Sequence, residues 1–378
     1  MRKSAIAILA VIGLVLVAAA CTPVATIGGA GPAPQPTIPH ATARKPLFVH
    51  YYLWWDGAHW LSKVGPHYPT TSLHLSLPAT LGSNGCTATT SYVGDTLLDV
   101  PAAPAGMYSQ DDPATFVRHV QEASSAGIDG FVVSWSGTGL ASQTSASAAF
   151  SRRLAMLASA VAAHNAAAGA RRFSLMLGYE GLDNSRGPRA TTAVANDLAY
   201  FARAYSANPV FHVSAYGAKP VVMLLDSRKF SLAALHSIVD PLHSKITFIG
   251  DEHGVTEWNR GVAAMFDGDG WYWSAENPYT NPGAFAQLRA LSTTLHFEHK
   301  LWFSPLAAGY NKSNFGLGGS CVPRNGTQTL RDLYAGNATS NPDGWMLISW
   351  NEFLENTYVE PSLRYGTADL NAIRQLFP

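Results

Sequence analysis

The chain has 378 residues, of which 47% are apolar and only 13% are charged, whereas an average domain has about 25% charged residues. Lysine plus arginine and aspartate plus glutamate each number 25, so the formal net charge is zero. Because neither sign is in excess, electrostatic attraction to nucleic acid or to an acidic membrane surface is excluded as the basis of function.

The first 21 residues have the pattern of an export signal. Arg2 and Lys3 precede an apolar run over 5–17 that is short for a bilayer span, and three alanines then lead to Cys21. A cysteine in this position resembles a bacterial lipoprotein box, although Ala18 stands where that box usually has leucine. We therefore expect an exported protein whose only membrane attachment is a lipid on Cys21; ordinary cleavage and secretion is the alternative.

Residues 22–44 are rich in Pro, Gly, Ala and Thr and are predicted to be a flexible linker. Residues 45–378 then form the catalytic domain, and no internal repeat or second boundary divides them. Eight apolar runs in this domain are short and nearly uninterrupted, as expected for strands buried on both faces. The predicted strands cover 47–52, 130–135, 173–179, 220–225, 246–250, 263–266, 301–304 and 345–350.

Helical patterns lie between these runs. Asp112 and Pro113 are typical of a helix start, and the alanine-rich stretch 148–168 strongly favours a helix. Further helices are predicted over 192–206, 232–239, 282–291, 327–334 and 367–377. The alternation predicts a single (β/α)8 barrel with a long first strand-to-helix connection, about 53–111. A doubly wound open sheet is the runner-up, but no glycine-rich phosphate loop follows the first strand.

Two cysteines remain if Cys21 carries a lipid. Cys86 and Cys321 both lie in glycine-rich, loop-like sequence. In an exported protein a disulfide between them is predicted, which would connect an early loop to a late one; two free thiols are the alternative.

Aromatic residues, carboxylates and histidines gather after the predicted strands. In a barrel the chemistry belongs at the C-terminal strand ends, and this mixture favours a sugar-binding site over a phosphate site. Because side chains alternate along a strand, at most one of Tyr51 and Tyr52 faces the interior. The candidate substrate-binding residues are Tyr51, Tyr52, Trp54, Trp55, His59, Trp135, Tyr179, Glu180, Asp226, Asp251, Trp273, Tyr310, Asn351 and Tyr358.

Two acidic clusters raise the question of a metal. The run 251–253 (Asp-Glu-His) has no paired-histidine spacing, and the run 267–270 (Asp-Gly-Asp-Gly) lacks the remaining ligands of a calcium loop, so we interpret it as a turn. We expect neither a metal ion nor another cofactor.

The segment 350–360 carries the strongest signal. Glu352 and Glu355 follow a buried strand, and their neighbours are aromatic or apolar rather than basic. Three-residue spacing in a helical turn puts side chains about 5–6 Å apart at Cβ, and retaining glycosidases need carboxyls roughly 5–5.5 Å apart. Mutual repulsion and partial burial would raise one pKa, which would provide an acid and a base at neutral pH. We predict these two glutamates to be catalytic.

Several segments match a known family in the right order. They are 51–55 with 59–60, 126–131 with 134–135, 179–180, 266–268, 304–305 with 309–310, and 351–355 followed by 360–361. Along nearly all of 46–378 the chain resembles glycoside hydrolase family 99, the endo-α-1,2-mannosidases and mannanases, and its wider clan. The resemblance implies a (β/α)8 barrel and retaining hydrolysis of an α-linked, mannan-like polysaccharide without a metal.

The resemblance also implies roles. Glu352 would act as base on the sugar 2-hydroxyl, so that O2 attacks the anomeric carbon, and Glu355 would be the general acid and then the base. Tyr51 or Tyr52, Trp135, Glu180 and Tyr358 would line the subsites. The chain departs from the family at 353–354 (Phe-Leu for Trp-His) and at 356–358 (Asn-Thr-Tyr for Gly-Thr-Gln).

Two alternatives stay open. The tail 360–366 is also similar to bacterial relatives linked to polysaccharide assembly, which would make the protein glycosyltransferase-like. A non-catalytic glycan-binding lipoprotein is the other alternative. In each case the expected partner is an oligo- or polysaccharide, and we expect a monomer.

Overall fold

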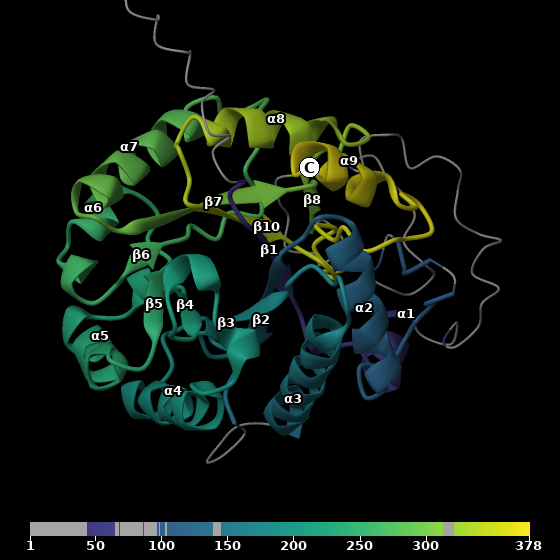
Figure 1. Ribbon diagram of the computed structural model, residues 1–378. Helices are drawn as coiled ribbons and strands as arrows, with labels where there is room; N and C mark the ends of the chain where they lie inside the picture. Colours follow the sequence, from purple (N-terminus) through teal and green to yellow (C-terminus); the bar gives the residue numbers. More distant parts are fainter. Residues whose placement is uncertain are drawn as a thin grey trace, which may run out of the picture. The chain divides into compact units, whose positions relative to one another are not determined.

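The computed structural model describes residues 44–64, 68, 86, 97, 99–102, 104–138, 145–312 and 321–378, without the side chains of 145–147 (Figure 1). The predicted export signal, Cys21 and all but the last residue of the predicted linker lie outside these residues. Residues 44–378 form one compact unit. None of the described helices is long and apolar enough to cross a membrane.

Parallel strands close into a barrel in the order β1-β10-β7-β6-β5-β4-β3-β2, which confirms the predicted fold class. The strands of the barrel are β1 (Leu47–Tyr51), β2 (Gly130–Trp135), β3 (Ser174–Glu180), β4 (Val221–Leu225), β5 (Thr247–Gly250), β6 (Gly268–Asp269), β7 (Leu301–Ala307) and β10 (Gly344–Ile348). A separate hairpin pairs β8 (Tyr310–Asn311) with β9 (Cys321–Val322).

Helices surround the barrel in chain order, as Figure 1 shows for α2 to α9. Their bounds are α1 (Gly57–Val64), α2 (Pro113–Ser125), α3 (Ser145–Ala166), α4 (Thr191–Tyr205), α5 (Leu232–Val239), α6 (Val255–Trp258), α7 (Ala284–Phe297), α8 (Gln328–Ala338) and α9 (Ala368–Leu376). α2 begins as predicted, because the Asp112 carboxylate accepts a hydrogen bond from Ala114 N at 3.0 Å and Pro113 occupies the first turn.

Alternation along each strand divides the core into two layers. Side chains on one face of the strands fill the barrel interior and form a small buried cluster. This cluster includes Phe48, Val132, Met176 and Met346. The alternate residues of the same strands belong to a much larger cluster shared with the helices. This parity decides which strand-end side chains can reach the candidate site.

The predicted strand over 263–266 is wrong. The structure instead has a short 3-10 helix, Val262–Ala264, and the Phe266 N–H donates to the Val262 carbonyl at 3.1 Å. The strand follows at Gly268–Asp269, where β6 pairs with β5 and β7. The apolar run misled the prediction because Met265 and Phe266 are buried in the layer between barrel and helices rather than in a strand.

The predicted disulfide is present. Cys86 and Cys321 are bonded across 235 residues of sequence, which ties the first strand-to-helix connection to β9. A covalent link over so long a loop restricts the unfolded chain and so favours the folded state.

Gly268 permits the narrow approach of β6 to β7. A Cβ on Gly268 would lie 2.5 Å from the Leu301 carbonyl oxygen, a backbone atom that cannot turn away. We predict that Gly268→Ala lowers the free energy of unfolding by about 1–3 kcal/mol through overpacking, as measured by denaturant titration. Gly187→Ala is the matched control, because its Cβ would meet nothing closer than 3.6 Å. Equal stability of both variants would contradict this account.

Candidate active site

Glu352 and Glu355 lie on one hydrogen-bonded turn directly after β10. The Glu352 side chain accepts from Leu354 N at 2.8 Å and from Glu355 N at 3.4 Å, so the turn folds back on its own carboxylate. The Ser349 hydroxyl oxygen accepts from Glu352 N at 3.0 Å. Glu352 is only 4% exposed, whereas Glu355 is half-buried. The turn therefore places the two glutamates at the C-terminal end of the barrel in unequal surroundings.

The two carboxyls differ in their affinity for a proton. Burial raises the pKa of Glu352 well above its usual range, and the neighbouring charge of Glu355 raises it further. Burial also raises the pKa of Glu355, but the positive charges of Lys312 and Arg186 act in the opposite direction. Of the two carboxyls, Glu352 therefore holds a proton more firmly than Glu355 does.

Two tyrosines lie beside this pair. The hydroxyls of Tyr52, after β1, and Tyr272, after β6, are 2.5 Å apart. Burial raises the pKa of Tyr52, and the charges of Glu352 and then Glu180 raise it further. The pKa of Tyr272 is likewise raised by burial. Both phenols thus stay protonated at neutral pH. One of them donates to the other, and the second keeps its O–H free to donate to a bound hydroxyl or carboxylate.

Glu180 is a third carboxyl at the same end of the barrel. It ends β3 on the interior side of the sheet and accepts a 2.5 Å hydrogen bond from the Ser134 hydroxyl of β2. Burial raises its pKa, and Ser134 partly offsets that effect. Glu180 is therefore able to bind a sugar hydroxyl beside Tyr52.

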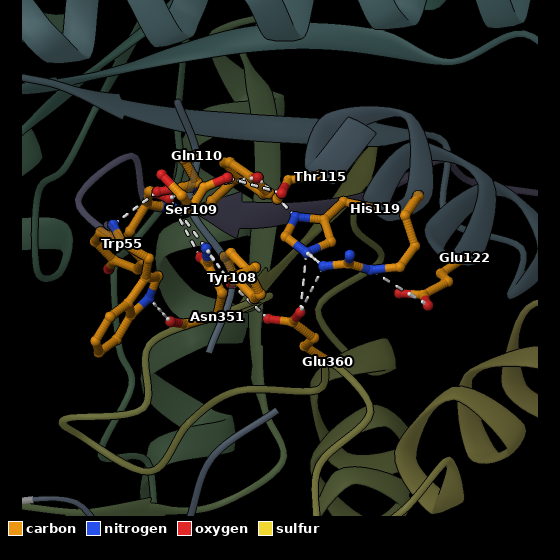
Figure 2. Close-up of polar contacts among 12 residues, drawn as sticks. Trp55, Tyr108, Ser109, Gln110, Thr115, His119, Glu122, Asn351 and Glu360 are labelled. Carbon is orange, nitrogen blue, oxygen red and sulfur yellow. Dashed lines mark hydrogen bonds and ion pairs between the residues drawn. The ribbon is translucent and has the colours of Figure 1, made fainter. Parts of the chain in front are cut away.

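A buried polar network holds the end of β1 against the glutamate turn (Figure 2). The Asn351 side chain accepts from Tyr52 N at 2.9 Å and donates to Tyr52 O at 3.0 Å. Gln110 also donates to Tyr52 O, at 2.8 Å, and accepts from Trp55 N at 2.8 Å. These amide contacts fix the backbone of Tyr52 immediately beside the residue that precedes Glu352.

Glu360 anchors the other side of this network. Figure 2 shows its carboxylate directed at Tyr108 and His119: the Tyr108 hydroxyl donates to it at 2.8 Å, and His119 Nε2 lies 2.9 Å from it. His119 Nε2 also lies 2.9 Å from the Arg118 guanidinium, and His119 Nδ1 lies 2.7 Å from the Tyr51 hydroxyl. Every member is buried, so this Tyr-His-Glu arrangement supports the site without reaching a substrate.

Three predicted substrate-binding residues face away from the barrel interior, which corrects their assignment. Tyr51 packs toward α2, where its hydroxyl meets His119. Trp135 donates to Ser151 of α3 at 3.1 Å, and Tyr179 donates to Asp197 of α4 at 2.9 Å. All are fully buried. The physical reason is strand alternation, because their neighbours Tyr52, Ser134 and Glu180 occupy the interior face.

Four more predicted residues are buried in supporting roles. Trp55 stacks on Trp60 with ring centroids 3.8 Å apart, and Asn351 binds the backbone of Tyr52. The Tyr358 hydroxyl donates to Asp99 at 2.6 Å. Asp251 accepts from Asp226 N at 2.8 Å and from Tyr272 N at 2.9 Å. Their polar groups are engaged within the protein, so we correct their predicted role from binding to positioning.

The remaining predicted residues lie nearer the candidate site or at its margin. Trp54 stacks on Tyr52 with centroids 4.3 Å apart, and His59 stacks on Trp54 at 6.2 Å. Asp226 pairs with Arg228 at 2.7 Å, and Trp273 stacks on Trp271 at 4.4 Å. Burial raises the pKa of Tyr310, in β8, and the charge of Glu355 raises it further. The half-buried Trp54 is the most suitable of these as a flat surface for a sugar ring.

Sequence reasoning missed Tyr272, Ser134 and Lys312 as site residues. Tyr272 was not among the predicted site residues, although its neighbour Trp273 was; with β6 at 268–269, Tyr272 falls just beyond the end of that strand. Ser134 could have been found from its alternation with Trp135. Nothing in the sequence around Lys312 indicates a site residue, because only the fold brings its hairpin to the glutamate turn.

The part of the chain that the structure describes contains no group of three or more His, Cys, Asp or Glu residues arranged to hold a metal ion. The described residues provide two carboxyls of unequal proton affinity, flanked by phenols and a third carboxyl, which suits general acid–base chemistry.

No protein-family model matches the sequence. No curated protein matches it either. Among solved structures, the GH99 endo-alpha-mannosidase from Bacteroides thetaiotaomicron in complex with BIS-TRIS-propane is similar, with a TM-score of 0.64 and 18% identity over 88% of this chain and 96% of that chain.

A second structure of that Bacteroides enzyme has a TM-score of 0.63 and 19% identity, covering 87% of this chain and 96% of that chain. A structure described as a glycoside hydrolase-like protein has a TM-score of 0.57 and 14% identity, covering 74% and 89%. At these identities the similarity shows a shared fold. The structural neighbours thus include the family that the sequence resembles.

His50 makes a prediction about stability and pH. It is 1% exposed in the barrel interior, its ring packs edge-on against Tyr272 at 4.9 Å, and burial lowers its pKa to about 3. Unfolded His50 binds a proton below about pH 6.5, whereas folded His50 stays neutral. The contribution of this residue to stability is therefore present above pH 6.5 and is lost as pH falls toward 3, by up to about 1.4 kcal/mol per pH unit.

We expect His50→Asn to flatten this acid-side decline relative to the unmodified protein, measured by denaturant titration between pH 4 and 7. His299→Asn, at an exposed position, is the control and should keep the original slope. An unchanged slope in His50→Asn would show that another group causes the decline.

Proposed function

We propose that this chain is a glycoside hydrolase, a retaining endo-glycosidase that cleaves an α-linked, mannan-like polysaccharide with Glu352 and Glu355. The observation that carries the proposal is the placement of both carboxyls on one turn after β10, one buried and one half-buried. Two further observations support the proposal. The chain shares its barrel with a GH99 endo-alpha-mannosidase, and its motifs occur in the order of that family along the sequence.

In the proposed reaction Glu352 accepts the proton of the sugar 2-hydroxyl, and O2 forms a bond to the anomeric carbon. The bond from that carbon to the leaving oxygen breaks, and Glu355 donates its proton to this oxygen. Water then attacks the anomeric carbon of the 1,2-anhydro sugar and gives a proton to Glu355. The bond between that carbon and O2 breaks, and O2 regains the proton from Glu352. Two displacements at one carbon retain its configuration.

The proton must be on Glu355 at the start, whereas burial by itself favours a proton on Glu352. A substrate resolves this conflict, because a 2-hydroxyl that donates a hydrogen bond to Glu352 stabilises its charged form. The one proton shared by the pair then moves to Glu355. Tyr52 and Glu180 are placed to orient the sugar hydroxyls around this exchange.

The location of the protein is also part of the proposal. A disulfide between Cys86 and Cys321 is typical of an oxidising compartment. It supports export, which the apolar segment before Cys21 predicts independently. We propose a lipid-anchored protein outside the cytoplasm, where polysaccharide is accessible.

Replacing either glutamate tests the function. We predict that Glu352→Gln and Glu355→Gln each lower kcat by about 10²–10⁴-fold while the thermal unfolding temperature stays near that of the unmodified protein. Product release should be measured from a panel of α-mannans and α-glucans, with water as the only acceptor. NMR of the first product formed should show retention of the anomeric configuration.

Glu298→Gln is the matched control and should keep full activity, because Glu298 caps the C-terminal end of α7 and binds the Trp258 indole instead. Undiminished hydrolysis in both test variants would refute the assignment. Release that requires an activated sugar donor would indicate a transferase, and glycan binding without any release would indicate a binding protein.

A further inference from the structure

A short hairpin is attached to the turn that carries the two glutamates. β8 and β9 pair in antiparallel fashion, with Asn311 opposite Cys321. The Asn311 N–H donates to the Glu355 carbonyl at 2.7 Å. The backbone of the glutamate turn is therefore bound to this hairpin at the residue that carries one of the reacting carboxyls.

A disulfide and a buried arginine hold the hairpin in place. Cys321 is bonded to Cys86, and Arg324, just beyond β9, is fully buried. The Arg324 guanidinium donates to the carbonyls of Asn356 and Tyr358 at 2.9 and 2.7 Å and pairs with Asp369 at 2.6 Å. Arg324 therefore connects the hairpin to the residues that follow Glu355.

Lys312 directly follows the residue that binds the Glu355 carbonyl. Its ammonium lies 5.7 Å from the centroid of the Tyr310 ring, and among the described residues it forms no ion pair within 4 Å. Its charge is the strongest favourable influence on ionised Glu355, ahead of that of the exposed Arg186. A partly buried cation beside a carboxylate is screened less by salt than an exposed one.

We propose that the β8–β9 hairpin is a positioning element: it holds Lys312 beside Glu355, where the lysine stabilises the charged form of that glutamate. Its catalytic consequence rests on the proposed function: Lys312 sets how readily Glu355 gives up its proton to the leaving oxygen. Lys312 acts through Glu355 and is a positioning residue, not a catalytic one.

Other groups act on the same carboxyls from neighbouring elements. Glu352 lies on the same turn, and Tyr310 comes from the hairpin. Tyr272, which follows β6, and Tyr52, which follows β1, are both coupled to the charge of Glu355. Tyrosines stay neutral near pH 7 and burial keeps the proton on Glu352, so Lys312 and Arg186 are the charges that act on Glu355 there.

The test compares Lys312→Met with Lys312→Arg. The titration of Glu355 is isolated as the difference in proton uptake between each protein and the same protein carrying Glu355→Gln. We expect the midpoint to move to higher pH in Lys312→Met and to stay near its original value in Lys312→Arg. An unmoved midpoint in Lys312→Met, or equal movement in both variants, would overturn the proposal.

Lys63→Met provides a second reference, because Lys63 acts on Glu352 rather than on Glu355. It should leave the Glu355 midpoint near its original value, and an equal movement there would show a general loss of positive charge instead. Where hydrolysis is measured, Lys312→Met should also move the alkaline limb of the kcat profile upward, because Glu355 then keeps its proton to higher pH. The titration needs no substrate, so it still decides the role of Lys312 if the chain hydrolyses no glycan.

Discussion

Burial of two carboxyls on one turn is the constraint on which the candidate site depends. Glu352 has no cation in direct contact among the described residues, and its side chain is satisfied by backbone N–H groups of its own turn. A carboxyl in such a place keeps its proton because removing the charged form from water is costly. Glu355 is half-buried and faces positive charge, so the same turn produces two different acids.

The surroundings of this turn are rigid because each side is fixed by buried polar contacts. Asn351 and Gln110 bind the backbone after β1, and Glu360 joins that region to α2 through His119. On the opposite side Arg324 holds the carbonyls that follow Glu355. Breaking a buried polar contact is costly, so these contacts hold the turn that carries the two carboxyls in place.

The barrel could be predicted from sequence because each strand buried on both faces leaves a short apolar run, and helical patterns separate the runs. The exception was 263–266, where residues packed outside the sheet have the same apolar character as a strand. Glu352, Glu355 and Glu180 were predicted as site residues because carboxylates after buried strands are unusual. Trp135 and Tyr179 were misassigned because a strand end alone does not say which way a side chain faces.

The sequence by itself determined the order of strands and helices, the acidic pair three residues apart and the cysteines available for pairing. Local spacing encodes these features, since side-chain periodicity depends only on near neighbours in the chain. The tertiary structure decided which of two adjacent aromatic residues faces the interior, that Tyr272 meets Tyr52, and that the hairpin preceding Lys312 binds the backbone of Glu355. Closure of the barrel and formation of the disulfide bring together residues that are far apart in the chain. The local sequence around a residue does not show which distant residue it will contact.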